Sequence, residues 1–119
     1  MPATHAAETA SFVHLHVHSH YSVLDSAATV RGIVDAAVLH GMPAVALTDH
    51  NSLAGAPAFF DYAIRQGIKP IIGLEANLTA DLKSRNQPVH HIILLARDQT
   101  GYCNLMKLST LSYTHGFAD

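Results

Sequence analysis

The stretch FVHLHVHSH, residues 12–20, places a histidine at every second position of an apolar run. In a β-strand, successive side chains point to opposite faces, so the four histidines would share one face and Val13, Leu15 and Val17 the other. Residues two apart on a strand lie roughly 6.6 Å apart, a span from which two imidazoles can bind one metal ion or two adjacent ions. A histidine-rich tag or a polar strand face would explain a single H-x-H equally well, so the rest of the chain has to decide.

Helix-like and strand-like segments alternate after this stretch. The predicted elements are a helix that begins after Ser26 or Thr29 and ends near Gly41, a buried strand at 43–47, a helix at 52–66 with Ser52 as a cap and Gly67 as its end, and a strand at 70–74. This β-α-β-α-β order implies parallel strands joined by right-handed crossovers. The predicted fold class is therefore α/β.

The segment after Glu75 breaks the alternation. Residues 76–80 can extend the strand, 81–88 are polar and turn-like, and 89–96 form another apolar strand with no helix between them. Such a connection most simply makes an antiparallel hairpin, which would return His90 and His91 to the neighbourhood of Glu75. Strand register decides which of the two histidines points toward Glu75. Asp98 can cap a final helix that includes Leu105, Leu108 and Leu111, followed by a tail at 113–119.

Composition indicates one small globular domain. The 119 residues are 49% hydrophobic and 13% charged, and the formal net charge of −2 gives no basic footprint for strong binding of nucleic acid or a membrane surface by this chain alone. The single cysteine, Cys103, excludes an internal disulfide and a cysteine-based zinc site, and it fits a cytoplasmic location. No apolar segment approaches the ~20 residues of a membrane span. Residues 1–11 lack the features of a secretory signal and are interpreted as a flexible leader.

Polar residues stand where the predicted strands end, and the carboxyl ends of parallel strands meet at one edge of a sheet. In chain order these residues are His16, His18, Asp25, Asp49, His50, Glu75 and either His90 or His91. Taken singly, Asp49 could be a helix cap and Glu75 a surface charge. Together, imidazoles and carboxylates without thiolates suit Zn, Mn or Fe in a hydrolytic site. Bridging carboxylates would allow two metals ~3.5–4 Å apart, as in phosphoester hydrolysis.

Four motifs resemble successive motifs of the polymerase and histidinol phosphatase (PHP) domain family: HVHS at 16–19, ALTDH at 46–50, GIKPIIGLE at 67–75 and HIILLA at 91–96. Four more resemble its polymerase branch, the amino-terminal PHP domain of bacterial DNA polymerase III alpha subunits: FVHL at 12–15, YSVLD at 21–25, GMPA at 41–44 and GYCNL at 101–105. The resemblance covers residues 12–117, which is nearly the whole chain.

The resemblance implies a distorted (βα)7 barrel, of which residues 12–119 would be the amino-terminal half. Carried over position by position, the metal ligands are His16, His18, Asp25, His50, Glu75 and His91. They imply divalent metal ions, up to three in a complete domain. Asp49 matches a position that would orient a ligand or move a proton, and is the predicted catalytic residue. His14 departs from the aspartate that is commoner in the family but agrees with the polymerase branch.

The functional expectation is a segment of a DNA-directed DNA polymerase, a nucleotidyltransferase of DNA replication, that carries a metal-dependent phosphoesterase or 3′–5′ exonuclease site. The later ligand motifs of the family have no counterpart here, so this fragment alone is expected to be inactive. The implied partners are the rest of the alpha subunit, the proofreading exonuclease subunit, and DNA through the parent protein, with no membrane. Two alternatives remain: a metal-stabilised structural module that docks the exonuclease subunit, and a free-standing phosphatase of the PHP family.

Overall fold

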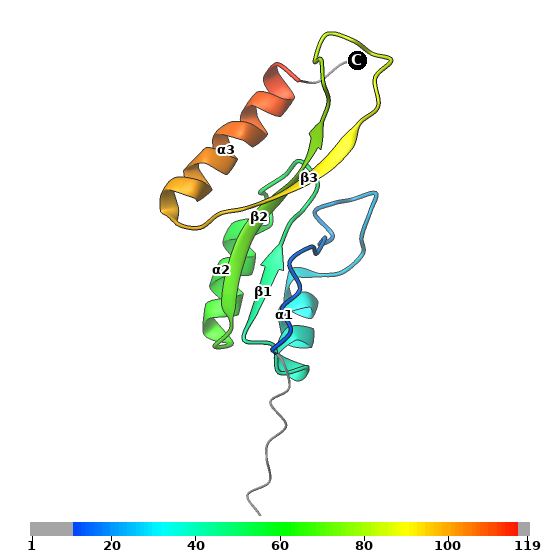
Figure 1. The fold of residues 1–119 in the computed structure, drawn as a ribbon. Coiled ribbons are helices and arrows are strands. Elements are labelled where there is room, and N and C mark those ends of the chain that lie inside the picture. Colours follow the sequence, from blue (N-terminus) through cyan, green and yellow to red (C-terminus); the bar gives the residue numbers. More distant parts are fainter. Residues whose placement is uncertain (1–10, 117–119) are drawn as a thin grey trace, which may run out of the picture.

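The computed structural model describes residues 11–116 and shows an α/β fold with a three-stranded sheet (Figure 1). The elements are α1 (Val30–Leu39), β1 (Ala44–Leu47), α2 (Ala56–Arg65), β2 (Lys69–Leu78), β3 (His90–Leu95) and α3 (Gln99–Thr114). The predicted leader, except for Ser11, and residues 117–119 lie outside the described part. The predicted tail was too long by two residues, because α3 continues to Thr114.

The sheet has the order β1-β2-β3 and combines both kinds of strand pairing. β1 and β2 are parallel, from Ala44 opposite Lys69 to Leu47 opposite Ile72, and α2 connects them. β2 and β3 are antiparallel, which confirms the predicted hairpin. Because β2 has ten residues, it carries Glu75 three residues before its end and extends beyond β1.

The prediction of a strand at residues 12–20 is wrong, although this segment does run beside β1 (Figure 1). The N–H of Ala46 donates to the carbonyl of His14 at 2.9 Å, and the N–H of Thr48 donates to that of Val17 at 2.8 Å. The two donors are two residues apart, whereas the two acceptors in the histidine segment are three residues apart. The extra residue interrupts a regular ladder of hydrogen bonds, as a β-bulge does. The hydroxyl of Thr48 accepts from the N–H of Val17 at 2.9 Å and replaces a backbone partner.

Thr29 and Asp98 cap their helices as predicted. The Thr29 hydroxyl accepts from the N–H of Gly32 at 3.0 Å, and the Asp98 carboxylate accepts from the N–H of Gly101 at 2.9 Å. Each bond satisfies one of the N–H groups that a helix start leaves unpaired. After α1, Gly41 has a φ of 68°, a left-handed conformation that glycine adopts readily and that ends the helix.

The predicted start of the second helix was wrong. α2 begins at Ala56 rather than near Ser52, whose hydroxyl accepts from the N–H of Ala54 in the preceding turn. Pro57 stands in the first turn, where a missing N–H costs nothing. The predicted end at Gly67, which has a φ of 75°, is confirmed.

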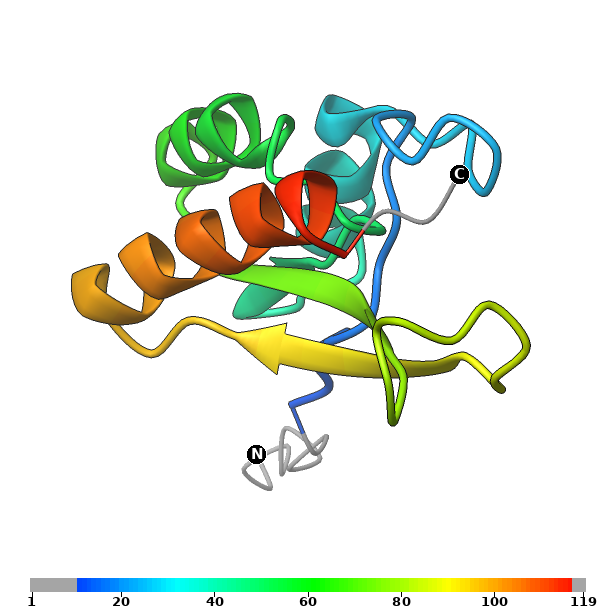
Figure 2. The same ribbon diagram turned by 90° about the horizontal axis from the view of Figure 1, so that it is seen from above.

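The hydrophobic core lies between the sheet and the helices α1 and α2, and α3 covers the same face of the sheet (Figure 2). Val34, Phe59 and Ala63 pack there against Val45 and other residues of the sheet. Residues directly opposite in an antiparallel pair share a face, so Glu75 lies with Ile93, and Asn77 with His91, on the face turned away from the helices. The sheet thus separates the apolar core from a face that carries polar side chains around Glu75 and Asn77, which we call the polar face.

Candidate metal centre

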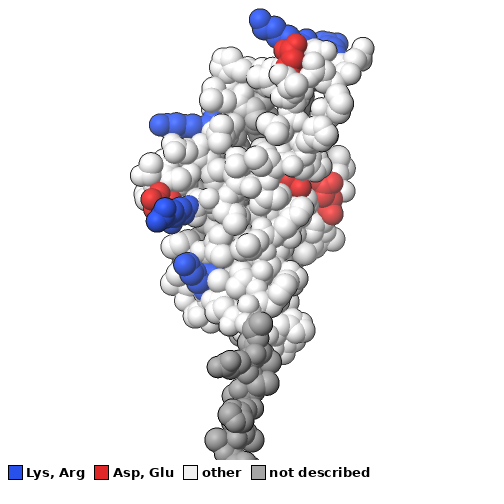
Figure 3. Space-filling view, viewed as in Figure 1, with Lys and Arg blue, Asp and Glu red and all other residues white. Residues whose placement is uncertain are grey.

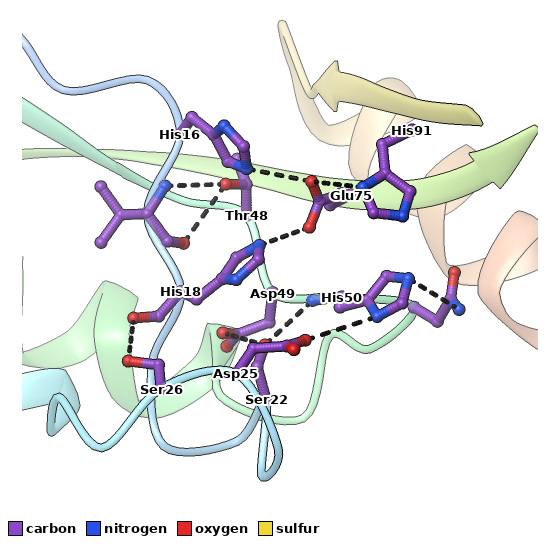
Figure 4. Close-up of polar contacts among 12 residues, drawn as sticks. His16, His18, Ser22, Asp25, Ser26, Thr48, Asp49, His50, Glu75 and His91 are labelled. Atoms are coloured by element: carbon purple, nitrogen blue, oxygen red, sulfur yellow. Dashed lines mark hydrogen bonds and ion pairs between the residues drawn. The ribbon is translucent and has the colours of Figure 1, made fainter. Parts of the chain in front are cut away.

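Glu75 is the centre of the polar face. Its side chain is only 4% exposed, and its carboxylate contacts three imidazoles (Figure 4). His16 Nε2 lies 3.0 Å and His91 Nδ1 3.4 Å from Oε1, and His18 Nε2 lies 2.5 Å from Oε2. The first two histidines of this group come from the segment beside β1, and the third comes from β3. Residues far apart in the sequence therefore converge on one buried carboxylate.

The environment of His18 tests whether a cation suits this cluster. Its Nε2 is buried and has no hydrogen-bond partner among the residues that the structure describes, because the close approach to Glu75 lacks hydrogen-bond geometry. A buried nitrogen without such a partner is costly. Ligand atoms of His16, His18 and Glu75 all lie within 4.8 Å of one another. Two ligands ~2.1 Å from a shared ion are themselves roughly 3–4 Å apart. The 3.0 Å between His16 and Glu75 agrees with this spacing, and the 2.5 Å between His18 and Glu75 is shorter. The donor types and their proximity therefore suit a divalent metal once His18 moves slightly away from Glu75.

A second group, Asp25 and His50, adjoins the first. His50 Nδ1 lies 3.6 Å from Asp25 Oδ2, which is beyond hydrogen-bond length, and His50 Nε2 lies 2.8 Å from Asn77 Oδ1. When Nε2 donates its proton to Asn77, the lone pair of Nδ1 faces the Asp25 carboxylate, an arrangement that a cation would stabilise. The ring centroids of His50 and His91 are 5.2 Å apart, so His91 lies between the two groups.

Asp49 has a different environment from the other acidic residues. It is 1% exposed, and its Oδ1 accepts from the N–H of Ser19 at 2.6 Å and from the hydroxyl of Ser22 at 2.8 Å. Its Oδ2 accepts from the hydroxyl of Ser19 at 2.7 Å. These bonds fix the turn that follows the histidine segment. Asp49 therefore stabilises this turn, while its predicted catalytic role stays a prediction.

Residues 14–119 match the family model described as the PHP domain. The chain belongs to the PHP domain family. Among curated proteins, this PHP domain is 46% identical over 112 residues to the DNA polymerase III subunit alpha of Borreliella burgdorferi, covering 89% of this chain and 10% of that protein. It is 43% identical over 117 residues to the same subunit of Aquifex aeolicus, again covering 89% and 10%. The error-prone DNA polymerase of Symbiobacterium thermophilum is 46% identical over 103 residues, covering 87% and 9%.

Solved structures share the fold of this PHP domain. An amidohydrolase from Chromobacterium violaceum superposes with a TM-score of 0.60 at 28% identity, covering 80% of this chain and 32% of that one. A putative metal-dependent phosphoesterase from Bifidobacterium adolescentis gives a TM-score of 0.53 at 19% identity, covering 80% and 31%. The chain therefore spans about a third of these structures, and about a tenth of the length of the curated relatives that it matches.

The charge distribution of the PHP domain agrees with its composition. Figure 3 shows a face on which charged side chains are few and occur at separate points.

None of the helices within residues 11–116 is long and apolar enough to cross a membrane.

The structure brings the six predicted metal ligands of the PHP domain into two adjoining groups, and their role as ligands stays a prediction. It places His90 on the opposite face of the sheet from His91, because β3 pairs His91 with Asn77 and His90 with Leu78. His14 and His20 are exposed, and the ring of His14 packs edge-on against Phe12 with centroids 4.7 Å apart.

Sequence reasoning missed two polar residues of this PHP domain, Ser22 and Asn77. Asn77 stands two residues after Glu75, so strand alternation would have placed it on the same face. Ser22 lies in an irregular turn, and no periodicity identifies its contacts with Asp49 and with the N–H of His50.

Proposed function

We propose that this chain is the amino-terminal PHP segment of a DNA polymerase III alpha subunit, and that its polar face is a metal-dependent phosphoesterase site with 3′–5′ exonuclease activity in the complete protein. The convergence of three imidazoles on the buried carboxylate of Glu75 carries this proposal. Support for the polymerase parent comes from the polymerase relatives, which are 46% and 43% identical in the regions that match.

The residues divide into holding and supporting roles. His16, His18 and Glu75 would hold one ion, and Asp25, His50 and His91 would complete a neighbouring position, with up to three ions of Zn, Mn or Fe in a complete domain. When bound, such ions supply positive charge that stabilises the charge developing on a phosphodiester during hydrolysis. Glu75 makes a hydrogen bond with His16 and a close contact with His18, and Asn77 holds the ring of His50 with Nδ1 toward Asp25. Asp49 orients the turn that leads to Asp25.

The rest of the alpha subunit would supply what this segment lacks. Since the chain spans about a tenth of its polymerase relatives, we place template-directed synthesis, most DNA contacts and the remaining metal ligands in the other parts of that protein. The 119-residue chain alone is then expected to show no nuclease activity.

The test uses the full-length polymerase subunit that contains this segment. Metal content and release of 3′-terminal nucleotides from DNA are measured for the wild type and for His16→Ala, His50→Ala and His91→Ala. His90→Ala is the matched control, because His90 occupies the neighbouring position of β3 on the opposite face of the sheet. The proposal predicts loss of metal and of nuclease activity in the first three variants and wild-type values in the control. Bound metal together with unchanged activity in all of these variants would refute the catalytic role.

The structural alternative has one observation in its favour. β3 forms the outer edge of the sheet, and its apolar side chains Ile92 and Leu95 are 38% and 41% exposed. An edge strand with exposed apolar groups is suited to pairing with other polypeptide, such as the proofreading exonuclease subunit. A metal-induced rise in melting temperature without any nuclease activity in the full-length subunit would favour this alternative.

A further inference from the structure

The hydroxyl of Ser22 makes two hydrogen bonds at the back of the candidate metal centre. It donates to Asp49 Oδ1 at 2.8 Å and accepts from the N–H of His50 at 3.0 Å. Ser22 is only 6% exposed, so water cannot easily replace either bond. We propose that Ser22 is a positioning residue that fixes Asp25 and His50 relative to each other through the buried carboxylate of Asp49 (Figure 4).

Ser22 controls the position of Asp25 through the backbone. Its N–H donates to the carbonyl of Ser19 at 2.9 Å, and its own carbonyl accepts from the N–H of Asp25 at 2.8 Å. Ser22 is thus shared by two consecutive tight turns, the first of which Asp49 holds in place by its bonds to Ser19. A displacement of Ser22 would move Asp25 with it.

Ser22 also controls the position of His50. β1 ends at Leu47, and at Asn51 the chain adopts a φ of 52°, a left-handed conformation that asparagine tolerates better than most residues. On one side of His50, the N–H of Asn51 donates to the carbonyl of Glu75 at 2.8 Å. On the other side, the N–H of His50 donates to Ser22. His50 is therefore held between the strand that carries Glu75 and the turn that carries Asp25.

Ser19 provides a matched comparison for Ser22. Its hydroxyl donates to the same carboxylate at 2.7 Å, and Ser19 is 0% exposed. However, that hydroxyl accepts from the N–H of Tyr21 at 3.2 Å rather than from His50. Ser19→Ala should therefore weaken the support of Asp49 without releasing His50, whereas Ser22→Ala should do both. A purely structural role of Ser22 would make the two variants alike.

The first experiment is metal-free and uses the 119-residue chain. NMR spectra record hydrogen exchange of the His50 amide and the chemical shifts of its ring for the wild type, Ser22→Ala, Ser19→Ala and the exposed control Ser84→Ala. We expect faster exchange and shifted ring signals at His50 only in Ser22→Ala, because the amide loses its acceptor. If Ser22→Ala does not fold, Ser22→Cys takes its place, since a thiol keeps a side chain there but is a weak acceptor. Unchanged His50 signals in the folded Ser22 variant, or equal changes in Ser19→Ala, would overturn the proposal.

The second experiment measures Co²⁺ binding and the visible spectrum of the bound ion in the full-length subunit. It rests on the proposed function, since only then do Asp25 and His50 face a metal. Substitution of a residue that holds a metal ligand typically lowers metal affinity by about 10–100-fold. We expect a loss of Co²⁺ affinity of this size, with an altered spectrum, for Ser22→Ala, and a loss of less than about threefold for Ser19→Ala. Wild-type protein that binds no Co²⁺ would contradict the proposed function, while the metal-free spectra would still decide the role of Ser22. Wild-type binding that is unchanged in Ser22→Ala would overturn the positioning role alone.

Discussion

Replacing Asp49 by alanine should cause a much larger loss of stability than the replacement of an exposed aspartate. The carboxylate is 1% exposed and accepts hydrogen bonds from the Ser19 N–H, the Ser19 hydroxyl and the Ser22 hydroxyl. A hydrogen bond to a charged group contributes about 1.5–3 kcal/mol, so the three bonds together contribute roughly 5–9 kcal/mol. Removing the carboxylate also removes its own cost of burial, which is several kcal/mol. The net loss in the free energy of unfolding should therefore be about 3–5 kcal/mol.

Urea-induced unfolding, followed by far-ultraviolet circular dichroism, measures this loss in the 119-residue chain. The matched control is Asp61→Ala, because the side chain of Asp61 is 61% exposed and, within residues 11–116, pairs only with Arg65, one helical turn away. That variant should change the unfolding free energy by less than about 0.5 kcal/mol. A loss of less than about 1 kcal/mol in Asp49→Ala would refute the reasoning, because the three bonds would then contribute hardly more than the burial of the carboxylate costs.

Three further predictions concern the packing at Gly73, the hydrogen bond between Tyr62 and Asp35, and the cap of α1. Gly73→Ala should destabilise the fold by about 1–3 kcal/mol, because a Cβ would stand 2.8 Å from the backbone oxygen of Leu94; an unfolding midpoint equal to that of the wild type would contradict this. The hydrogen bond from Tyr62 to Asp35 raises the pKa of Tyr62 above its ordinary value of 10.0, an effect that burial reinforces and a nearby arginine opposes. The contribution of this hydrogen bond to stability is therefore complete below pH 10.0 and is lost as the pH rises through the higher pKa of the folded state. Asp35→Asn should lower the midpoint at which Tyr62 becomes a phenolate in an absorbance titration. An unchanged midpoint would exclude the hydrogen bond as the cause. Thr29→Ala should cost about 1 kcal/mol in thermal unfolding, and Thr29→Ser should restore most of it, since only the hydroxyl caps α1.

Local signals predicted the regular part of the fold well. The caps Thr29 and Asp98, and the helix ends at Gly41 and Gly67, are set by neighbouring backbone groups that a sequence pattern can identify. The hairpin followed from two apolar runs without a helix between them. Ser52 was misassigned because its hydroxyl bonds within a local turn, which competes with helix capping.

Tertiary contacts decided what periodicity could not. The alternating histidines predicted a strand, but the mismatch of one residue against β1 prevents a regular ladder, and only packing reveals such a mismatch. The same pattern predicted four equivalent imidazoles, whereas the structure brings only two of these four, His16 and His18, to Glu75. The residues alone left His90 and His91 open, because a sequence does not contain the register of a strand. The family resemblance indicated His91, and β3 places His91 on the same face as Glu75. Asp49 was predicted as a site residue, but the serine contacts that explain its burial come from an irregular turn.

The central claim is that the buried carboxylate of Glu75 and its histidines form a metal site. Isothermal titration of the metal-free full-length subunit with Zn²⁺ and Mn²⁺, for the wild type and Glu75→Gln, tests it most directly. Glutamine keeps the size and shape of the side chain but lacks the charge that a cation requires. The account predicts that the wild type binds at least one of these ions and that Glu75→Gln, with an unchanged fold by circular dichroism, loses most of this binding. Equal affinity of the two proteins for the same ion would contradict the account.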